Sequence, residues 1–180
     1  LGAQLKSLDL LRQLPAAGAP KQVAVVVGAL GVIGRYIVAQ LLQDGWMVIG
    51  LSRRTEPDRE RLRYISVDLL DRADCAAKLA ELTGVTHIFY AAFQATSGMA
   101  ADYAANVVPN RDMLVNAVSA ISNAAETLRR VVLVTGTKTY GVHLGPYKTP
   151  AREDDPRLPV PNYYYDQVDW LCAFQRGKAW

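Results

Sequence analysis

Three consecutive tyrosines lie near the start of the stretch NYYYDQVDW, residues 162–170, and they raise the question of phenol chemistry. A positioned phenol can donate a hydrogen bond or a proton to a substrate. Adjacent tyrosines can equally be packing residues whose hydroxyls reach water. No lysine stands four positions after any of the three tyrosines. The choice between catalysis and packing therefore depends on what the preceding chain builds.

A second group with recognisable chemistry is the glycine loop GALGVIG, which follows an apolar run and has the spacing GxxGxxG. Gly28 permits a tight turn, Gly31 lets backbone N–H groups approach a pyrophosphate, and Gly34 lets strand and helix pack closely. The helix that begins at Val32 and Ile33 would direct its free N–H groups and the positive end of its dipole at the phosphates. The alternative is a tight strand-to-helix turn that binds no ligand.

The end of the second expected strand carries Ser52, Arg53 and Arg54, where a site for NAD has an acidic residue for the ribose 2′-hydroxyl. A guanidinium can bind a 2′-phosphate through two hydrogen bonds, and a serine can add another. These residues predict NADP(H) rather than NAD(H). The alternative is a pair of solvated arginines, because Arg59 and Arg61 lie close by in the sequence.

Two further strand ends complete the predicted cofactor site. Asp68, followed by Leu69, comes after the third expected strand and is placed to accept a hydrogen bond from the adenine amino group. Asp68 could instead cap the following helix. Ala91 and Ala92 end the fourth expected strand, where small side chains would let the nicotinamide half lie against the backbone.

Apolar runs alternate with helical stripes along the chain, and this alternation predicts the elements that position these residues. The expected strands are 22–28, 46–53, 63–69, 86–93 and 129–136, and the expected helices are 32–45, 71–84, 101–128 and 163–176. We expect an interruption near Pro109 and a loop over 137–161, which is rich in Gly and Pro. Strands that alternate with helices imply right-handed βαβ units, so the fold class is α/β with a doubly wound parallel sheet of the Rossmann-like kind.

The domain organisation follows from the same pattern. Residues 22–180 are expected to form one NADP-binding Rossmann-like domain, and residues 1–21 an N-terminal extension or linker. Charged residues interrupt the apolar positions of that extension, so it lacks the h-region of a signal peptide. The chain ends at Trp180, where another strand is expected to begin. We therefore expect a truncated domain, with further strands and a substrate region beyond it.

Composition excludes several classes of function. The 180 residues carry a net charge of +3 without a long basic run, which suits a phosphorylated ligand and does not indicate nucleic acid. No apolar run reaches membrane-spanning length, and only His87 and His143 are available, so neither a membrane nor a metal is expected. Cys75 and Cys172 lack CxxC spacing and are expected to be buried free thiols of a cytoplasmic protein. The oligomeric state is left open, with a homodimer as one candidate.

The glycine loop, the aspartate after the third strand and the tyrosine-bearing helix after the fifth together resemble the short-chain dehydrogenase/reductase family. Two features depart from that family's usual pattern. The family's catalytic tyrosine is followed four positions later by a lysine, which is missing here. Its serine near the end of the fifth strand is also missing, because Gly136 falls near that position.

Four motifs in order, TGTKTYG, GPYK, EDDPRLP and NYYYDQVD, resemble one atypical branch, the progesterone 5β-reductase and iridoid synthase family. The segment THIFYAAF resembles the fourth strand of that branch, so the likeness covers nearly the whole chain. The resemblance implies that the lysine of the first motif and a tyrosine of the last form the catalytic pair. At the matching positions this chain has Lys138 and Tyr164.

This chain differs from the pattern of that branch at two positions. Tyr163 falls where the branch has phenylalanine, and Val168 replaces the first of two acids, which leaves only Asp169. Asp154 and Asp155 of the third motif are expected to be a solvated acid pair, because nothing nearby suggests a metal.

The resemblance implies an NADPH-dependent oxidoreductase that reduces the C=C bond of a small carbonyl or enone substrate. Tyr164 would stabilise or protonate the enolate oxygen, and Lys138 would assist the phenol and bind the nicotinamide ribose. Which of the three tyrosines takes this role is left open. Two alternatives remain, an NAD(P)-dependent nucleotide-sugar epimerase or dehydratase and a non-catalytic dinucleotide-binding fragment. The missing Tyr-x-x-x-Lys counts against the epimerase.

Overall fold

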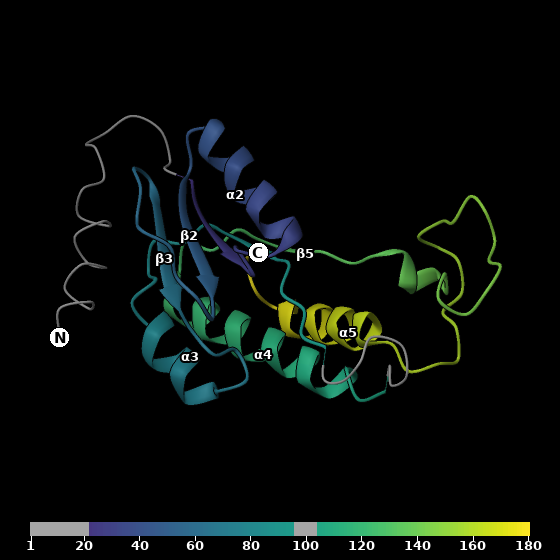
Figure 1. Ribbon diagram of the computed structural model, residues 1–180. Coiled ribbons are helices and arrows are strands. Elements are labelled where there is room, and N and C mark those ends of the chain that lie inside the picture. Colours follow the sequence, from purple (N-terminus) through teal and green to yellow (C-terminus); the bar gives the residue numbers. More distant parts are fainter. Residues whose placement is uncertain (1–21, 96–103) are drawn as a thin grey trace.

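The computed structural model describes residues 22–95 and 104–180, which form a parallel β-sheet with helices on both faces (Figure 1). The strand order is β3-β2-β1-β4-β5, and neighbouring strands pair in parallel. The strands are β1 (Val23–Val27), β2 (Met47–Ser52), β3 (Leu62–Ser66), β4 (His87–Tyr90) and β5 (Arg130–Leu133). The predicted doubly wound, Rossmann-like sheet is confirmed.

Burial explains the place of each strand in the sheet. Every residue of the central strand β1 is buried, whereas the edge strand β5 has one exposed and three half-buried residues. An unbroken apolar run has no polar side to turn toward water, so it is stable only where helices cover both faces of the sheet.

The helices divide between the two faces. They are α2 (Val32–Gln43), α3 (Arg72–Leu79), α4 (Val107–Ala124), α5 (Tyr163–Gln175) and the short 3₁₀-helix η1 (Thr137–Tyr140). On one face, Val38 of α2 packs against Val26 of β1. On the other face, Leu79 of α3 and Leu114 of α4 pack with Ile88 of β4. Helix α5 lies beside α4, on the side of the sheet opposite α2 (Figure 1).

The structure corrects the predicted start of the long helix. Helix α4 begins at Val107 after a turn at 104–106, and residues 101–103 of the predicted helix lie outside the described part of the chain. Pro109 lies in the first turn of α4, so the predicted interruption is wrong. The missing N–H of a proline costs nothing there, because the first N–H groups of a helix have no intrahelical partner.

Other boundaries also differ from the prediction, and β3, β4 and β5 each end three residues before the predicted position. Helix α3 ends at Leu79 rather than at residue 84, because a turn in which the Leu82 N–H donates to the Leu79 carbonyl (3.2 Å) buries Leu82 in the core. The predicted loop 137–161 contains η1 at its start. This 3₁₀-helix carries Lys138, five residues after the last residue of β5.

The strand order reverses at β1, which leads outward to β2 and β3 before the chain returns to β4 and β5 on its other side. In open parallel sheets the ligand crevice lies at the carboxyl ends of the strands beside such a reversal. The loops that follow β1, β2 and β4 meet at this edge.

Candidate active site

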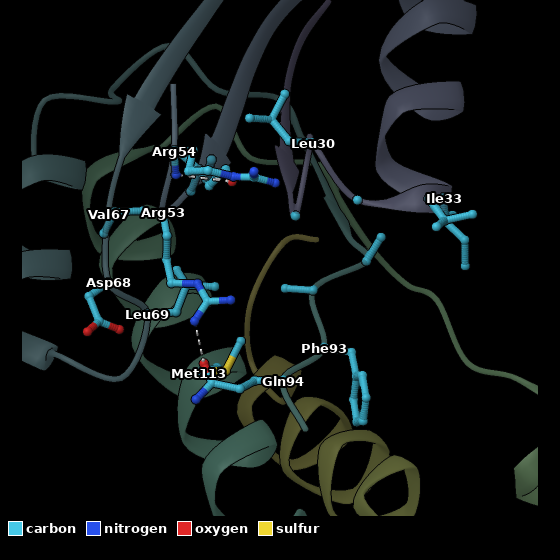
Figure 2. A pocket seen from close by; sticks show the side chains of 17 residues that line it. Leu30, Ile33, Arg53, Arg54, Val67, Asp68, Leu69, Phe93, Gln94 and Met113 are labelled. Carbon is cyan, nitrogen blue, oxygen red and sulfur yellow. Dashed lines mark hydrogen bonds between the residues drawn. The ribbon is translucent and has the colours of Figure 1, made fainter. Parts of the chain in front are cut away.

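A cleft of about 450 Å³ opens at the carboxyl edge of the sheet (Figure 2). The predicted cofactor residues that line it are Gly28, Gly31, Val32, Ile33, Ser52, Arg53, Arg54, Asp68, Leu69, Ala91 and Ala92. The structure thus brings together residues that the sequence placed after four separate strands. Three predicted residues do not line the cleft, namely Gly34, Lys138 and Tyr164.

The glycine loop has a backbone that only glycine fits at two positions. Gly28 has a φ of +84°, and a Cβ there would lie 2.9 Å from the backbone of Ala92. A Cβ at Gly34 would lie 2.1 Å from the Gly28 carbonyl oxygen, so Gly34 acts beneath the loop by letting α2 approach it. The first turn of α2 is open to the cleft, where the side chains of Val32 and Ile33 are exposed.

The side chains at the end of β2 extend over the cleft (Figure 2). Arg53 turns toward the loop after β4, where its Nη1 donates to Gln94 Oε1 over 3.4 Å. Arg54 is exposed beside it. Asp68 does not cap α3, because Asp71 is the N-cap and accepts hydrogen bonds from two backbone N–H groups of that helix. Asp68 is exposed and lines the cleft, but its carboxylate points outward (Figure 2), and its Oδ1 accepts a hydrogen bond from the Leu70 N–H over 3.0 Å.

Sequence reasoning missed several residues of the cleft, among them Phe93, Gln94 and Met113. Phe93 is the last residue of the predicted strand 86–93 and Gln94 follows it directly, so both continue the strand end that supplied Ala91 and Ala92. The fully buried Asn110 fixes the Gln94 backbone, accepting from its N–H (2.9 Å) and donating to its carbonyl (2.8 Å). Met113 had no local signal, because it reaches the cleft from α4.

The three tyrosines at the start of α5 have different surroundings. The Tyr163 ring is buried and lies against Phe93 at the wall of the cleft, with ring centroids 5.1 Å apart. Tyr165 is also buried, and its hydroxyl donates to the Thr139 carbonyl over 2.6 Å and accepts from the Leu158 N–H over 3.3 Å. The Tyr163 ring therefore packs, and the Tyr165 hydroxyl is engaged by backbone.

Tyr164 lies between these two residues and is half-buried. Its ring contacts that of Tyr163, with centroids 4.2 Å apart, and so joins the aromatic group that reaches the cleft through Phe93. Its hydroxyl lies 3.1 Å from the position that a Cβ of Gly136 would take. Within the described residues, this hydroxyl makes no hydrogen bond. Gly136, the residue that precedes η1, thus leaves room for the phenol.

Lys138 is held close to the start of α5. Its carbonyl accepts a hydrogen bond from Asn162 Nδ2 over 3.0 Å, and Asn162 is the residue that precedes α5. Burial, and then the positive charge of Lys138, lower the pKa of His143, which favours a neutral imidazole near the lysine. The structure therefore brings the Lys138 and Tyr164 backbones together, and a catalytic role for either residue stays a prediction.

The segment after η1 is fastened to α5 by charged side chains. Arg157 Nη1 donates to Asp169 Oδ2 over 2.8 Å, and the Arg157 guanidinium lies 4.9 Å from the centre of the Tyr165 ring. The hydrogen bond from Arg157 lowers the pKa of Asp169. Asp155 is not solvated as predicted, because it accepts from Lys148 Nζ and from a backbone N–H (2.8 Å). The motif EDDPRLP therefore serves to hold this segment.

The two cysteines differ in burial, which corrects one prediction. Cys75 is buried as predicted, and burial raises its thiol pKa to about 11. Cys172 was predicted to be buried, but it is exposed on α5. Among residues 22–95 and 104–180 we find no group of three His, Cys, Asp or Glu side chains that could hold a metal ion. The same residues contain no helix long and apolar enough to cross a membrane.

Known proteins resemble this chain in sequence. Residues 24–180 match a family described as the PRISE-like Rossmann-fold domain. An (S)-8-oxocitronellyl enol synthase of Nepeta cataria is 36% identical over 89% of this chain and 44% of its own length. A 3-oxo-Delta(4,5)-steroid 5-beta-reductase of Arabidopsis thaliana is 35% identical over 95% of this chain and 46% of its own length. The chain thus spans less than half the length of each relative.

A solved structure shares the fold. It is a short-chain dehydrogenase/reductase superfamily protein of Agrobacterium tumefaciens with bound NAD, and it superposes with a TM-score of 0.62 at 24% identity. The superposition covers 88% of this chain and 46% of the other.

Proposed function

The chain belongs to the PRISE-like Rossmann-fold family, which confirms the resemblance seen in its motifs, and on that premise we propose that it binds NADP(H) in an oxidoreductase that reduces enones. The reaction would add a hydride and a proton across a C=C bond conjugated to a carbonyl group. Both curated relatives described above have names that place them in reductive or enol-forming chemistry.

The residues present fit a nicotinamide dinucleotide. The glycine loop offers a close approach for a pyrophosphate, because Gly28 and Gly34 leave no side chain between the loop, α2 and Ala92. The N–H groups of the first turn of α2 lie beside the same cleft and favour an anion. Arg53 and Arg54 supply cationic donors at the end of β2, where a 2′-phosphate would need them.

The observation that supports the proposal most is the state of the Tyr164 hydroxyl. This hydroxyl makes no hydrogen bond within the described residues, whereas that of Tyr165 is engaged by backbone, and it lies beside Gly136, near the position where ordinary short-chain dehydrogenases/reductases have a serine. When bound, the nicotinamide would supply a hydride to the β-carbon of the enone. The Tyr164 hydroxyl would then donate a hydrogen bond, and finally its proton, to the enolate oxygen.

Lys138 would act on the same oxygen through Tyr164. Its ammonium group would stabilise the negative charge left on the phenol after proton transfer, and it would be a donor for the nicotinamide ribose. A lysine delivered by η1 would replace the lysine that ordinary short-chain dehydrogenases/reductases carry one turn after the tyrosine. Tyr163 and Phe93 would shield the reacting atoms from water along one side.

Two assays with the purified full-length protein test this function. The first follows NADPH oxidation with a small cyclic enone, and the second follows NAD-dependent conversion of a UDP-hexose. We expect turnover in the first and none in the second. Turnover of the UDP-hexose without reduction of the enone would favour an epimerase or dehydratase. Dinucleotide binding without turnover in either assay would indicate a non-catalytic binding module.

A further inference from the structure

Asn162 makes two side-chain hydrogen bonds that join the backbones of the two proposed catalytic residues. Its Oδ1 accepts from the Tyr164 N–H over 3.1 Å, and its Nδ2 donates to the Lys138 carbonyl over 3.0 Å. The side chain is almost fully enclosed, with 5% of Asn162 exposed. One side-chain amide therefore connects the start of α5 to Lys138, which lies 24 residues earlier in the sequence.

The orientation of this amide follows from its partners. The Tyr164 N–H can only donate and the Lys138 carbonyl can only accept, so a single assignment of the Asn162 oxygen and nitrogen satisfies both. Each side-chain atom then does a different task. The oxygen caps α5, as asparagine commonly does at a helix start, and the nitrogen reaches out of the helix to η1.

A second bond strengthens the same connection. Tyr165 donates from its hydroxyl to the Thr139 carbonyl over 2.6 Å, so two consecutive carbonyls of η1 are held by residues on either side of Tyr164. Neither bond uses the hydroxyl of Tyr164 or the ammonium of Lys138. The two bonds therefore fix the backbones of both residues without using the side-chain ends on which the proposed chemistry depends.

The geometry points to Asn162 as a positioning residue that sets the spacing between Lys138 and Tyr164. The inference rests on the proposed function for the roles of these two side chains. In this chain the lysine comes from a separate element rather than from the next turn of the tyrosine helix, so something other than the helix must fix the distance between them. A displacement of about 1 Å can cost roughly 100-fold in rate, which is why such a connection matters.

Three substitutions separate positioning from helix capping. Asn162→Asp and Asn162→Ser keep an oxygen that caps α5, but an ionised carboxylate has no donor for the Lys138 carbonyl and a serine is too short to reach it. Asn162→Ala removes both bonds. If Asn162 positions the pair, Asp and Ser lower kcat by roughly 10–100-fold while KM for NADPH and the Tm change little. Ala lowers kcat similarly and also lowers the Tm by roughly 2–4 °C.

A second measurement needs neither substrate nor cofactor. The N–H groups of Thr139 and Gly141 donate to the carbonyls of Gly136 and Lys138 within η1, which protects them from hydrogen exchange. Asn162→Ser should speed exchange in the peptide that covers 137–141 and leave the amides of α5 unchanged, because the cap is kept. Equal protection of this peptide in the variant and the wild type would overturn the inference.

Variants of the pair itself distinguish the two claims. If Tyr164→Phe and Lys138→Met abolish turnover while Asn162→Asp and Asn162→Ser retain it, the proposed function stands and the role of Asn162 is wrong. If Tyr164→Phe and Lys138→Met leave the rate unchanged, the proposed function fails. The exchange measurement then still decides whether Asn162 fastens η1 to α5.

Discussion

Arg53 extends from the end of β2 across the mouth of the cleft, where Gln94 accepts a hydrogen bond from its guanidinium over 3.4 Å. Such a long bond between exposed groups is weak, so a bound 2′-phosphate can replace it with a charge-assisted bidentate contact. Gln94 would hold the guanidinium near its working position. Arg54 follows directly and lines the same cleft.

We predict that Arg53→Ala combined with Arg54→Ala weakens binding of NADPH much more than binding of NADH. Each lost hydrogen bond to a charged group costs about 1.5–3 kcal/mol, which corresponds to roughly 10–100-fold in Kd. Fluorescence titration of the purified protein with both dinucleotides measures the two Kd values.

Arg59→Ala is the matched control for this prediction. Arg59 belongs to the same run of arginines, but it pairs with Glu56 (3.5 Å) and does not line the cleft. Its removal should leave both Kd values unchanged. An equal loss for NADPH and NADH in the double variant would mean that Arg53 and Arg54 do not select the phosphate.

At the scale of single residues, the sequence predicted a site residue correctly where the local backbone accepts only one residue type. Gly28 and Gly34 were found because a turn with positive φ and a close approach exclude other side chains. Asn162 was missed, because its side-chain hydrogen bond reaches a partner 24 residues away. No local pattern records such a partner.

Helix α5 and the segment that precedes it form the element on which the proposed chemistry depends. The segment leaves η1, turns back and returns to α5, where Arg157 pairs with Asp169 on the exposed side of the helix. The resemblance in the motifs led us to expect two acids in this part of α5, of which this chain has only Asp169. The structure shows that Asp169, the acid that is kept, pairs with the arginine of the EDDPRLP motif.

We predict that Asp169→Asn lowers the free energy of unfolding at neutral pH by about 0.2–1 kcal/mol, because the pair is exposed to solvent. The hydrogen bond from Arg157 holds the folded pKa of Asp169 below the ordinary value of 3.8. The stabilisation is therefore complete above that ordinary pKa and is lost as pH falls through the folded pKa. Urea unfolding of wild type and variant over a pH series measures the difference.

Asp154→Asn supplies the comparison for that series, since Asp154 is an exposed acid of the same segment. It should change the free energy of unfolding little at any pH. A difference between Asp169→Asn and the wild type that stays constant into acid would show that the pair with Arg157 does not cause the effect.

At the scale of elements, the central strand β1 was predicted best among the strands, and β3, β4 and β5 each end three residues before the predicted position. An apolar run long enough to cross the core selects the centre of a parallel sheet, so β1 was found to within one residue at each end. Helix ends were predicted less well, because Pro109 fits the first turn of α4 as easily as it breaks a helix interior. The 3₁₀-helix η1 gave no signal, since four residues contain no period to detect.

At the scale of the whole molecule, the sheet topology determines where the site lies. The reversal of strand order at β1 brings the loops after β1, β2 and β4 to one edge, and the cleft is found there (Figure 2). This location could be predicted from the alternation of strands and helices alone. The contact between Phe93 of the cleft and Tyr163 of α5 could not, because it depends on how α5 packs beside α4.

The central claim is that Tyr164 is the phenol that acts on the substrate oxygen. The most direct measurement is kcat/KM for NADPH-dependent reduction of a small cyclic enone by the full-length protein, in wild type, Tyr164→Phe and Tyr163→Phe. Both variants remove one hydroxyl and keep the ring, so packing is matched. We predict a loss of roughly 100–1,000-fold for Tyr164→Phe, the usual cost of removing a donor to a developing oxyanion, and a change of less than about threefold for Tyr163→Phe. Equal rates in Tyr164→Phe and the wild type, or a larger loss in Tyr163→Phe, would contradict the account.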